Sequence, residues 1–130
     1  MDLSKIIPTS DEIEVTLVYP GTDKVLENDD GTPMTITLYA PHTKEYKAGV
    51  YEQANKRIKE QQKEFTVQDW EASTTDLLIK SIKSWDITFD GEKPKATKAK
   101  VKEVITSKAG FWIVDQLQDK VNSFEAFTPA

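Results

Sequence analysis

Carboxylates and lysines are the side chains with the greatest capacity for chemistry in this chain, because its 130 residues include no cysteine and one histidine. That histidine, His42, lies between Pro41 and Thr43, where a predicted strand gives way to a predicted helix. A lone histidine at such a corner is more often a surface residue than a general base. Phosphate-binding glycine loops, Gly-x-Ser-x-Gly elbows and His-Glu-x-x-His zinc motifs do not occur in the sequence. The composition therefore excludes a thiol nucleophile, a disulfide framework and a cysteine-based zinc site.

An acidic segment at residues 22–31 invites comparison with the EF-hand calcium loop, which needs carboxylates at fixed positions. Placing Gly31 at the sixth position of that loop puts Leu26 at the first and Thr37 at the twelfth, and neither has a carboxylate. We therefore predict a solvated turn, no metal and no cofactor. Pairs of Asp and Glu that only the fold brings together are the remaining route to an enzyme, and we predict no catalytic site.

Six lysines gather between residues 93 and 108, although the net charge of the whole chain is −5. Lys98 and Lys102 share one face of a predicted helix, but no aromatic residue lies among the lysines to stack on bases. We predict a solvated helix face and no nucleic-acid partner. Residues 1–40 carry eight acids and two lysines. Two solvated faces of opposite sign are the favoured interpretation, and attraction between subunits is the alternative.

The elements that position these side chains begin with two strands, which alternation of apolar and polar residues predicts over residues 12–19 and 34–39. Val25 and Leu26 are expected to add a short third strand, with a hairpin turn after them. The side chains expected to face the core from the two longer strands are Ile13, Val15, Leu17, Tyr19, Met34, Ile36 and Leu38.

A long polar helix is predicted from Thr43 to about residue 63, with Thr43 as its N-cap and Glu45 in its first turn. Its apolar stripe is thin and consists of Tyr51, Ala54, Ile58 and Phe65. A helix of this kind either covers a sheet with one narrow face or packs against a partner.

The next helix is predicted over residues 73–84, where Leu78, Ile82 and Trp85 recur at i, i+4 and i+7. After Trp85 the apolar residues alternate, which predicts an extended segment over residues 85–89. Trp85 is expected to be a core anchor that joins two helices and not a contact for a partner.

Two more helices are predicted after a turn at Asp90 and Gly91. Thr97 caps the first of them, and Gly110 separates it from the second. The apolar stripes of the two helices consist of Val101, Val104 and Ile105, and of Ile113, Leu117, Val121 and Phe124.

These elements predict an α+β fold in which a small antiparallel N-terminal sheet of two or three strands packs with about four α-helices. We expect one domain over residues 1–130, with a flexible arm at 1–11, strands at 12–41 and an all-helical C-terminal half at 43–127. The longest apolar runs are far shorter than the roughly 20 residues of a membrane-spanning helix, and no signal-peptide pattern opens the chain. We therefore expect a soluble cytoplasmic protein with no membrane partner.

The C-terminal region contains more aromatic residues than two short helical stripes need for one small core. Most of them are expected to be core residues, because aromatic side chains dominate burial energetics. Those that fall off the stripes are expected to form an apolar patch for a partner protein. The predicted partner-binding residues are Trp70, Phe111, Trp112 and Phe127.

The order of these segments resembles that of the tail assembly chaperones of long, non-contractile-tailed bacteriophages. The resemblance covers residues 12–127 and depends on an N-terminal strand pair and the residues 36–43 that lead into a polar helix. It also depends on an apolar helix that ends at Trp85, the turn at 90–94 and the capped helix after it. Ala96 departs from the larger apolar residue expected before the cap, and Lys98-Ala99 stand where Glu-Asn is commoner.

The resemblance implies a late, non-enzymatic protein that binds the tape measure protein and keeps it soluble while the tail tube polymerises. It also implies contact with the tail tube protein through a frameshifted longer form, location in the bacterial host cytoplasm and absence from the mature virion. Several copies would serve one long client, so a homo-oligomer is expected. The alternatives are a structural tail or head-completion subunit that stays in the particle, and a small regulatory protein unrelated to phage.

Overall fold

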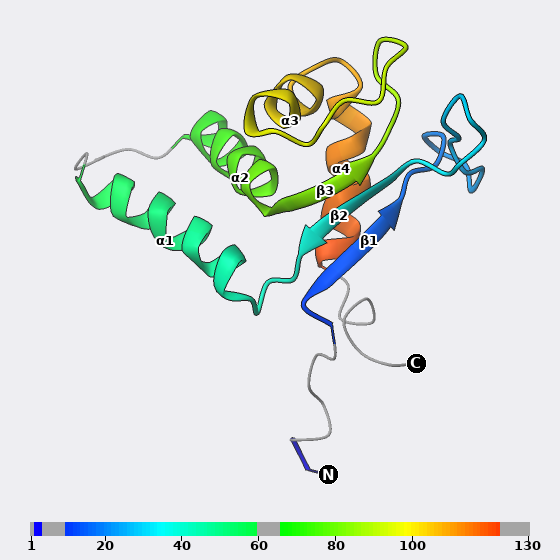
Figure 1. The fold of residues 1–130 in the computed structure, drawn as a ribbon. Helices are drawn as coiled ribbons and strands as arrows, with labels where there is room; N and C mark the ends of the chain where they lie inside the picture. Colours follow the sequence, from blue (N-terminus) through cyan, green and yellow to red (C-terminus); the bar gives the residue numbers. More distant parts are fainter. Residues whose placement is uncertain (1, 4–9, 60–65, 123–130) are drawn as a thin grey trace.

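The computed structural model describes residues 2–3, 10–59 and 66–122. The elements of this part of the chain are β1 (Glu12–Thr16), β2 (Thr35–Tyr39), α1 (Lys44–Lys59), α2 (Val67–Ser81), β3 (Ile82–Asp86), α3 (Lys98–Ile105) and α4 (Gly110–Val121) (Figure 1). They confirm the α+β class, the antiparallel sheet and the four helices. The expected all-helical C-terminal half is wrong, because β3 lies between α2 and α3.

The sheet is antiparallel throughout, with the strand order β1-β2-β3. Its third strand is therefore β3, and the expected strand at Val25 and Leu26 is wrong. Val25 instead forms an isolated bridge with Val18, beyond the end of β1. The extended segment predicted at 85–89 begins earlier than expected, at Ile82, and Phe89 forms its own bridge with Glu92 across a turn.

A β-bulge explains why β3 has the apolar spacing of a helix. Leu38 of β2 is opposite Ile82 and Ile36 is opposite Trp85, with the register shifting between them. Lys83 is the extra residue on β3, so Ile82 and Trp85 lie on one face although they are three residues apart. The same spacing places residues on one side of a helix, which is why residues 82–84 were expected to be helical.

Helices α2 and α4 contact the sheet and α3 packs against these two helices (Figure 1), and the core lies between these elements. The buried apolar side chains are Ile13, Val15, Leu17, Ile36, Leu38, Ala40, Leu78, Ile87, Val101, Val104, Ile105, Ile113 and Leu117. Most of the residues predicted for the core are among them. Tyr19 is an exception, since it is 47% exposed in the turn beyond β1 and its ring lies beneath the ammonium of Lys24.

Helix α4 is fixed to the sheet by a side-chain amide as well as by apolar contact. The Val18 amide donates to Gln116 Oε1 at 3.0 Å, and Gln116 Nε2 donates to the Val18 carbonyl at 2.8 Å. The Gln116 side chain thus forms hydrogen bonds with both the amide and the carbonyl of Val18, as the backbone of a neighbouring strand would.

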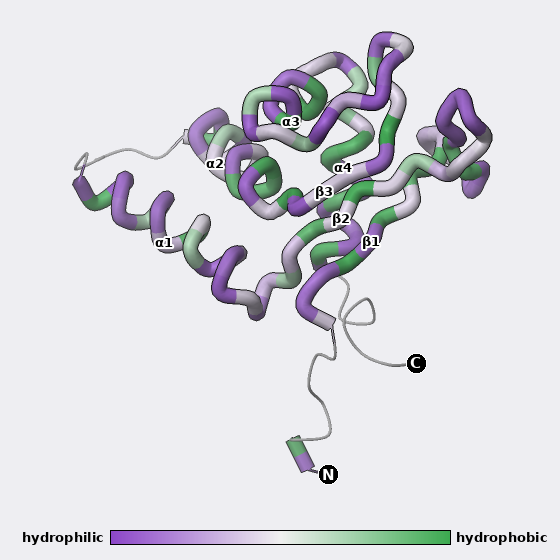
Figure 2. Tube along the Cα trace, viewed as in Figure 1, coloured by the Kyte–Doolittle hydropathy of each residue, from purple (hydrophilic) through white to green (hydrophobic). Residues whose placement is uncertain are grey.

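Helix α1 lies to one side of this assembly and makes substantial contact with α2 alone among the described elements (Figure 1). It is largely hydrophilic, whereas the strands and α4 carry strongly hydrophobic segments (Figure 2). Gly49 is its one buried residue. The N-cap predicted for α1 is confirmed, because the Tyr46 amide donates to Thr43 Oγ1 at 3.2 Å.

Helix α2 begins at Val67, six residues before the predicted start at Ser73. Thr66 and Asp69 form a capping box, in which each side chain accepts a hydrogen bond from the backbone amide of the other. Thr97 caps α3 as predicted. No described helix is both long and apolar enough to cross a membrane.

Candidate protein-binding surface

Two of the four residues predicted to contact a partner are strongly exposed. Trp70 on α2 is 63% exposed, and Phe111 on α4 is 81% exposed. Trp112 is half-buried and packs against the core. Phe127 lies outside the described residues. The surface available to a partner therefore includes Trp70 and Phe111, whereas most of the Trp112 contact area faces inward.

Trp70 stands at the edge of a hollow of about 220 Å³ between α1, α2 and α4. Its position follows from the capping box, which starts α2 early enough to place Trp70 in the first helical turn. Val67, one turn before it, is 72% exposed. The apolar side chains that line the hollow together with Trp70 are Tyr46, Leu77, Leu78 and Val121. An exposed indole beside a partly apolar recess suits the insertion of an apolar side chain from another protein.

Trp70 and Phe111 are at different places on the molecule. Gln118 and Val121, near the end of α4, border the hollow beside Trp70. Phe111 is at the start of α4, about 10 Å from Gln118 along the helix axis. The structure therefore does not bring the two strongly exposed residues, Trp70 and Phe111, into one patch.

A second exposed apolar group lies on α1. Tyr51 is 61% exposed and Ile58 is 75% exposed, and Ala54 between them is also exposed. These are three of the four residues of the predicted stripe, and Phe65 lies outside the described residues. Of the two roles expected for this stripe, covering the sheet is wrong. The helical spacing of the stripe in the sequence is a signal that could have identified these residues as candidate partner contacts.

Polar contacts accompany limited apolar packing where α1 meets α2. Gln53 Nε2 donates to the Ser73 carbonyl at 2.7 Å and to Asp76 Oδ2 at 3.2 Å. Gly49 allows close approach, because a Cβ there would lie 3.2 Å from Leu77 Cδ1. The side of α1 that faces α2 thus combines Tyr46 with the polar Gln53 and the small Gly49. The stripe of Tyr51, Ala54 and Ile58 is exposed.

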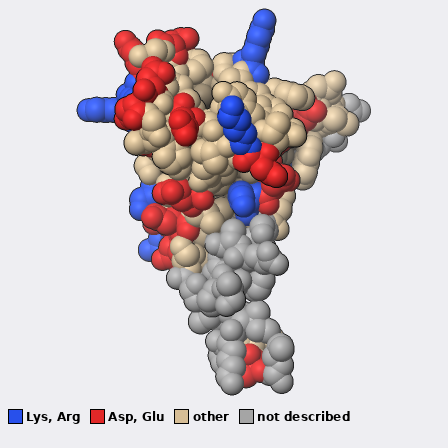
Figure 3. Space-filling model, turned by 90° about the vertical axis from the view of Figure 1, so that its right-hand side faces the viewer, with Lys and Arg blue, Asp and Glu red and all other residues tan. Residues whose placement is uncertain are grey.

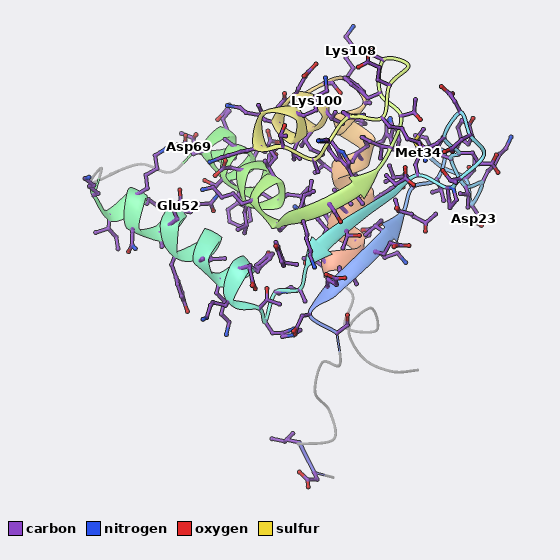
Figure 4. All side chains as sticks on the ribbon, viewed as in Figure 1. Asp23, Met34, Glu52, Asp69, Lys100 and Lys108 are labelled. Atoms are coloured by element: carbon purple, nitrogen blue, oxygen red, sulfur yellow. The ribbon has the colours of Figure 1, made fainter. Side chains whose placement is uncertain are left out.

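Lys80 of α2 links the two helices through an ion pair with Glu52 of α1, and it also pairs with Asp76 of its own helix. Its Nζ lies 3.3 Å from Glu52 Oε1 and 3.0 Å from Asp76 Oδ2, and Glu52 extends from α1 (Figure 4). Partial burial opposes the charge of Lys80, but hydrogen bonds with Asp76 and Glu52 outweigh it and raise the pKa of the ammonium. Burial opposes the charge of Asp76 as well, yet Lys80 and Gln53 lower the pKa of its carboxyl.

Helix α1 is basic, as is the segment 93–108, although the chain as a whole is acidic. The helix has five basic residues and two acidic ones in a chain whose net charge is −5. The side of the molecule turned away from α1 carries large groups of acidic side chains (Figure 3). A partner that approaches α1 therefore meets a locally basic surface.

The acidic loop that precedes β2 forms an ion pair with a lysine from the segment before α3. Lys93 Nζ lies 2.6 Å from Asp30 Oδ2 and 3.2 Å from Asp86 Oδ1. Across the described ranges, no three His, Cys, Asp or Glu side chains are grouped closely enough to hold a metal ion. His42 is exposed, as expected, with Nε2 3.1 Å from Asp11 Oδ1.

Comparison of the chain with family models, with curated proteins and with solved structures finds no match. The structure shows an α+β domain with exposed aromatic side chains and an apolar stripe on the outward-facing side of α1. Exposed aromatic side chains and apolar stripes of this kind are typical of surfaces that contact other proteins.

Proposed function

We propose that this protein is a tail assembly chaperone of a long, non-contractile-tailed bacteriophage. In this role it binds the tape measure protein and keeps that long, helical and partly apolar client soluble while tube subunits polymerise. It acts in the host cytoplasm, carries out no catalysis and is absent from the mature virion. Contact with the tail tube protein is made by a frameshifted longer form.

The exposed indole of Trp70 beside its partly apolar hollow is the observation that carries the proposal. Aromatic side chains supply large contact areas at low entropic cost, and a few of them dominate the energetics of many interfaces. A client helix can place its apolar face over Trp70 and Val67 with one side chain in the hollow. Acidic groups elsewhere on the surface keep the complex in solution.

Co-expression with the tape measure protein tests the proposal. We expect the client to be soluble with the wild-type chain and to aggregate without it. Trp70→Ser should reduce the soluble client by several-fold, because the central apolar contact is lost. Tyr19→Ser is the matched control, since Tyr19 is also an exposed aromatic residue but lies in the turn beyond β1. A client that is equally soluble with and without the chain contradicts the proposal.

Mass spectrometry of purified virions separates a chaperone from a retained structural subunit. The chaperone should be missing from particles that contain the tube and tape measure proteins. Stoichiometric amounts of this chain in the particle would replace the proposal with the structural alternative.

A further inference from the structure

The outer face of α1 combines apolar and basic residues on one side of the helix. With 3.6 residues per turn, the side chains on this face lie within about 100° of one another around the helix axis. They are Lys44, Lys47, Tyr51, Ala54, Asn55 and Ile58, and all of them are exposed. Gly49 and Gln53, which contact α2, lie on the opposite side.

This outer face has no acidic residue. The two acids of α1 are directed elsewhere: Glu52 pairs with Lys80 of α2, and Glu45 lies near Lys83 of β3. Neither Lys44 nor Lys47 has an ion pair with any residue that the structure describes. Within the described ranges, the positive charge of Lys44 and Lys47 on this face is therefore not neutralised by an ion pair.

A hollow of about 370 Å³ lies on this face at the start of α1. Its lining residues include the aromatic Tyr51 and the basic Lys44 and Lys47, together with His42 and Ala48. An apolar side chain with carboxylates beside it matches this combination. Further along the face, Ala54 is small enough to let another helix approach between Tyr51 and Ile58.

We infer that the outer face of α1 docks an amphipathic helix whose apolar stripe is flanked by Asp and Glu. Charge complementarity selects this occupant, because the face is basic and apolar and has no acid of its own. Its apolar part spans two turns, about 10 Å, and contains no Leu, Phe or Trp, which is too little for a bilayer surface. The identification of this helix as a segment of the client rests on the proposed function.

Binding of labelled peptides to the full chain tests the inference. The probes are overlapping 20-residue segments of the tape measure protein and a designed helix with a Leu stripe flanked by Glu. A copy of the designed helix with Lys in place of Glu is the control peptide. We expect acidic probes to bind, the Lys copy not to bind, and affinity to fall as salt shortens the roughly 10 Å screening length of 0.1 M solution.

Variants of α1 locate the binding site. Lys44→Glu with Lys47→Glu should weaken binding about tenfold or more, because attraction becomes repulsion at two positions. Tyr51→Ser with Ile58→Ser should weaken it to a similar degree through lost apolar contact. Lys98→Glu with Lys102→Glu on α3 is the matched control, with the same charge change on an exposed face, and should leave affinity within about twofold. Circular dichroism checks that every variant is folded.

The outcomes separate this inference from the proposed function. Wild-type affinity for acidic probes after both α1 substitutions overturns the inference, even if the chain still keeps the client soluble through Trp70. Equal losses for the α1 and α3 reversals also overturn it, because they indicate unspecific attraction. Binding to anionic phospholipid vesicles but to no peptide identifies a membrane occupant and overturns it too. Acidic helices that bind α1 while the client stays insoluble support the surface and contradict the chaperone assignment.

Discussion

Asn28 is a buried polar side chain that ties the acidic loop to the end of β3 and the segment after it. It is 3% exposed, and its Nδ2 group donates to Thr32 Oγ1 at 3.1 Å and to Asp86 Oδ1 at 3.3 Å. Its Oδ1 accepts from Thr88 Oγ1 at 2.7 Å. The loop is thus anchored to a segment almost 60 positions away in the sequence, and buried hydrogen bonds of this kind are costly to break. The sequence predicts a turn at this loop, but its spacing carries no sign of Asn28 as an anchor.

Trp85 is a second anchor, and its environment sets the size of its contribution to stability. The side chain is half-buried against the core, and Nε1 donates to the Pro94 carbonyl at 2.8 Å. We expect Trp85→Ala to lower the free energy of unfolding by about 2–3 kcal/mol, below the range for a fully buried tryptophan. Trp85→Phe should cost about 0.5–1.5 kcal/mol through loss of the hydrogen bond. Urea denaturation measures both, and a stable Trp85→Ala chain that fails to bind the client would make Trp85 a partner contact.

Gly110 permits the close approach of α4 to the end of α3. A Cβ at this position would lie 1.7 Å from the Ile105 carbonyl oxygen, a distance that forces the backbone to move. We expect Gly110→Ala to destabilise the protein by about 1–3 kcal/mol in thermal or urea unfolding. Gly49→Ala is the matched control, because its Cβ meets the flexible end of Leu77 and alanine favours the helix by about 1 kcal/mol. Equal effects of the two substitutions would show that the contact at Gly110 is relaxed in solution.

The elements could be predicted where one period explains the apolar residues, as in β1, β2 and the stripes of α3 and α4. Prediction failed at β3 because its bulge places Ile82 and Trp85 on one face at helical spacing. The start of α2 could have been found, since Thr66 and Asp69 have the spacing of a capping box. At the candidate site, the sequence identified exposed Trp70 and Phe111. It left two roles open for the α1 stripe, covering the sheet or contacting a partner, because tertiary contacts decide which way the stripe faces.

The Asp30–Lys93 pair joins the loop before β2 to the segment before α3, and its contribution depends on pH. Hydrogen bonds from Lys93 and then from Thr32 hold the pKa of Asp30 far below its ordinary value of 3.8. Hydrogen bonds with Asp30 and Asp86 raise the pKa of Lys93. Because the pKa of Asp30 is lower in the folded state, its contribution is complete above about pH 5 and is lost as the pH falls through the folded pKa. The contribution of Lys93 is lost only when the pH rises through its raised pKa.

Asp30→Asn is the variant that tests this dependence. The difference in urea midpoint between wild type and Asp30→Asn should be present at neutral pH, shrink below about pH 4 and decrease with salt. Asp23→Asn is the control, because Asp23 lies in a neighbouring turn (Figure 4) and no described residue forms an ion pair with it. A midpoint difference for Asp30→Asn that is constant from neutral pH to about pH 2 would mean that the pair adds nothing to stability.

The molecule as a whole consists of a core that is stabilised by buried apolar side chains and a peripheral helix, α1, that buries little apolar surface. Strands β1 and β2 pack with α2, α3 and α4 around one apolar cluster, whereas α1 buries Gly49 and depends on Gln53 and Lys80 for its attachment. Stability in proteins is not uniform, and elements with few buried apolar contacts open at lower free energy than the core. This arrangement suits the proposed function, because a weakly attached helix can adjust to different segments of a long client.

Native-state hydrogen exchange measures this difference directly. We expect the amides of α1 to exchange through local opening at a free energy at least about 2 kcal/mol below that of β2 and α4, which should require global unfolding. Gly49→Leu should accelerate exchange in α1 further, because a large side chain forces α1 away from Leu77, and should leave the core amides unchanged. Tyr51→Ser with Ile58→Ser should change global stability by less than about 0.5 kcal/mol, since both side chains are exposed. Exchange of α1 at the same free energy as β2 would instead make α1 part of one cooperative unit, with an outer face that is presented to partners in a fixed orientation.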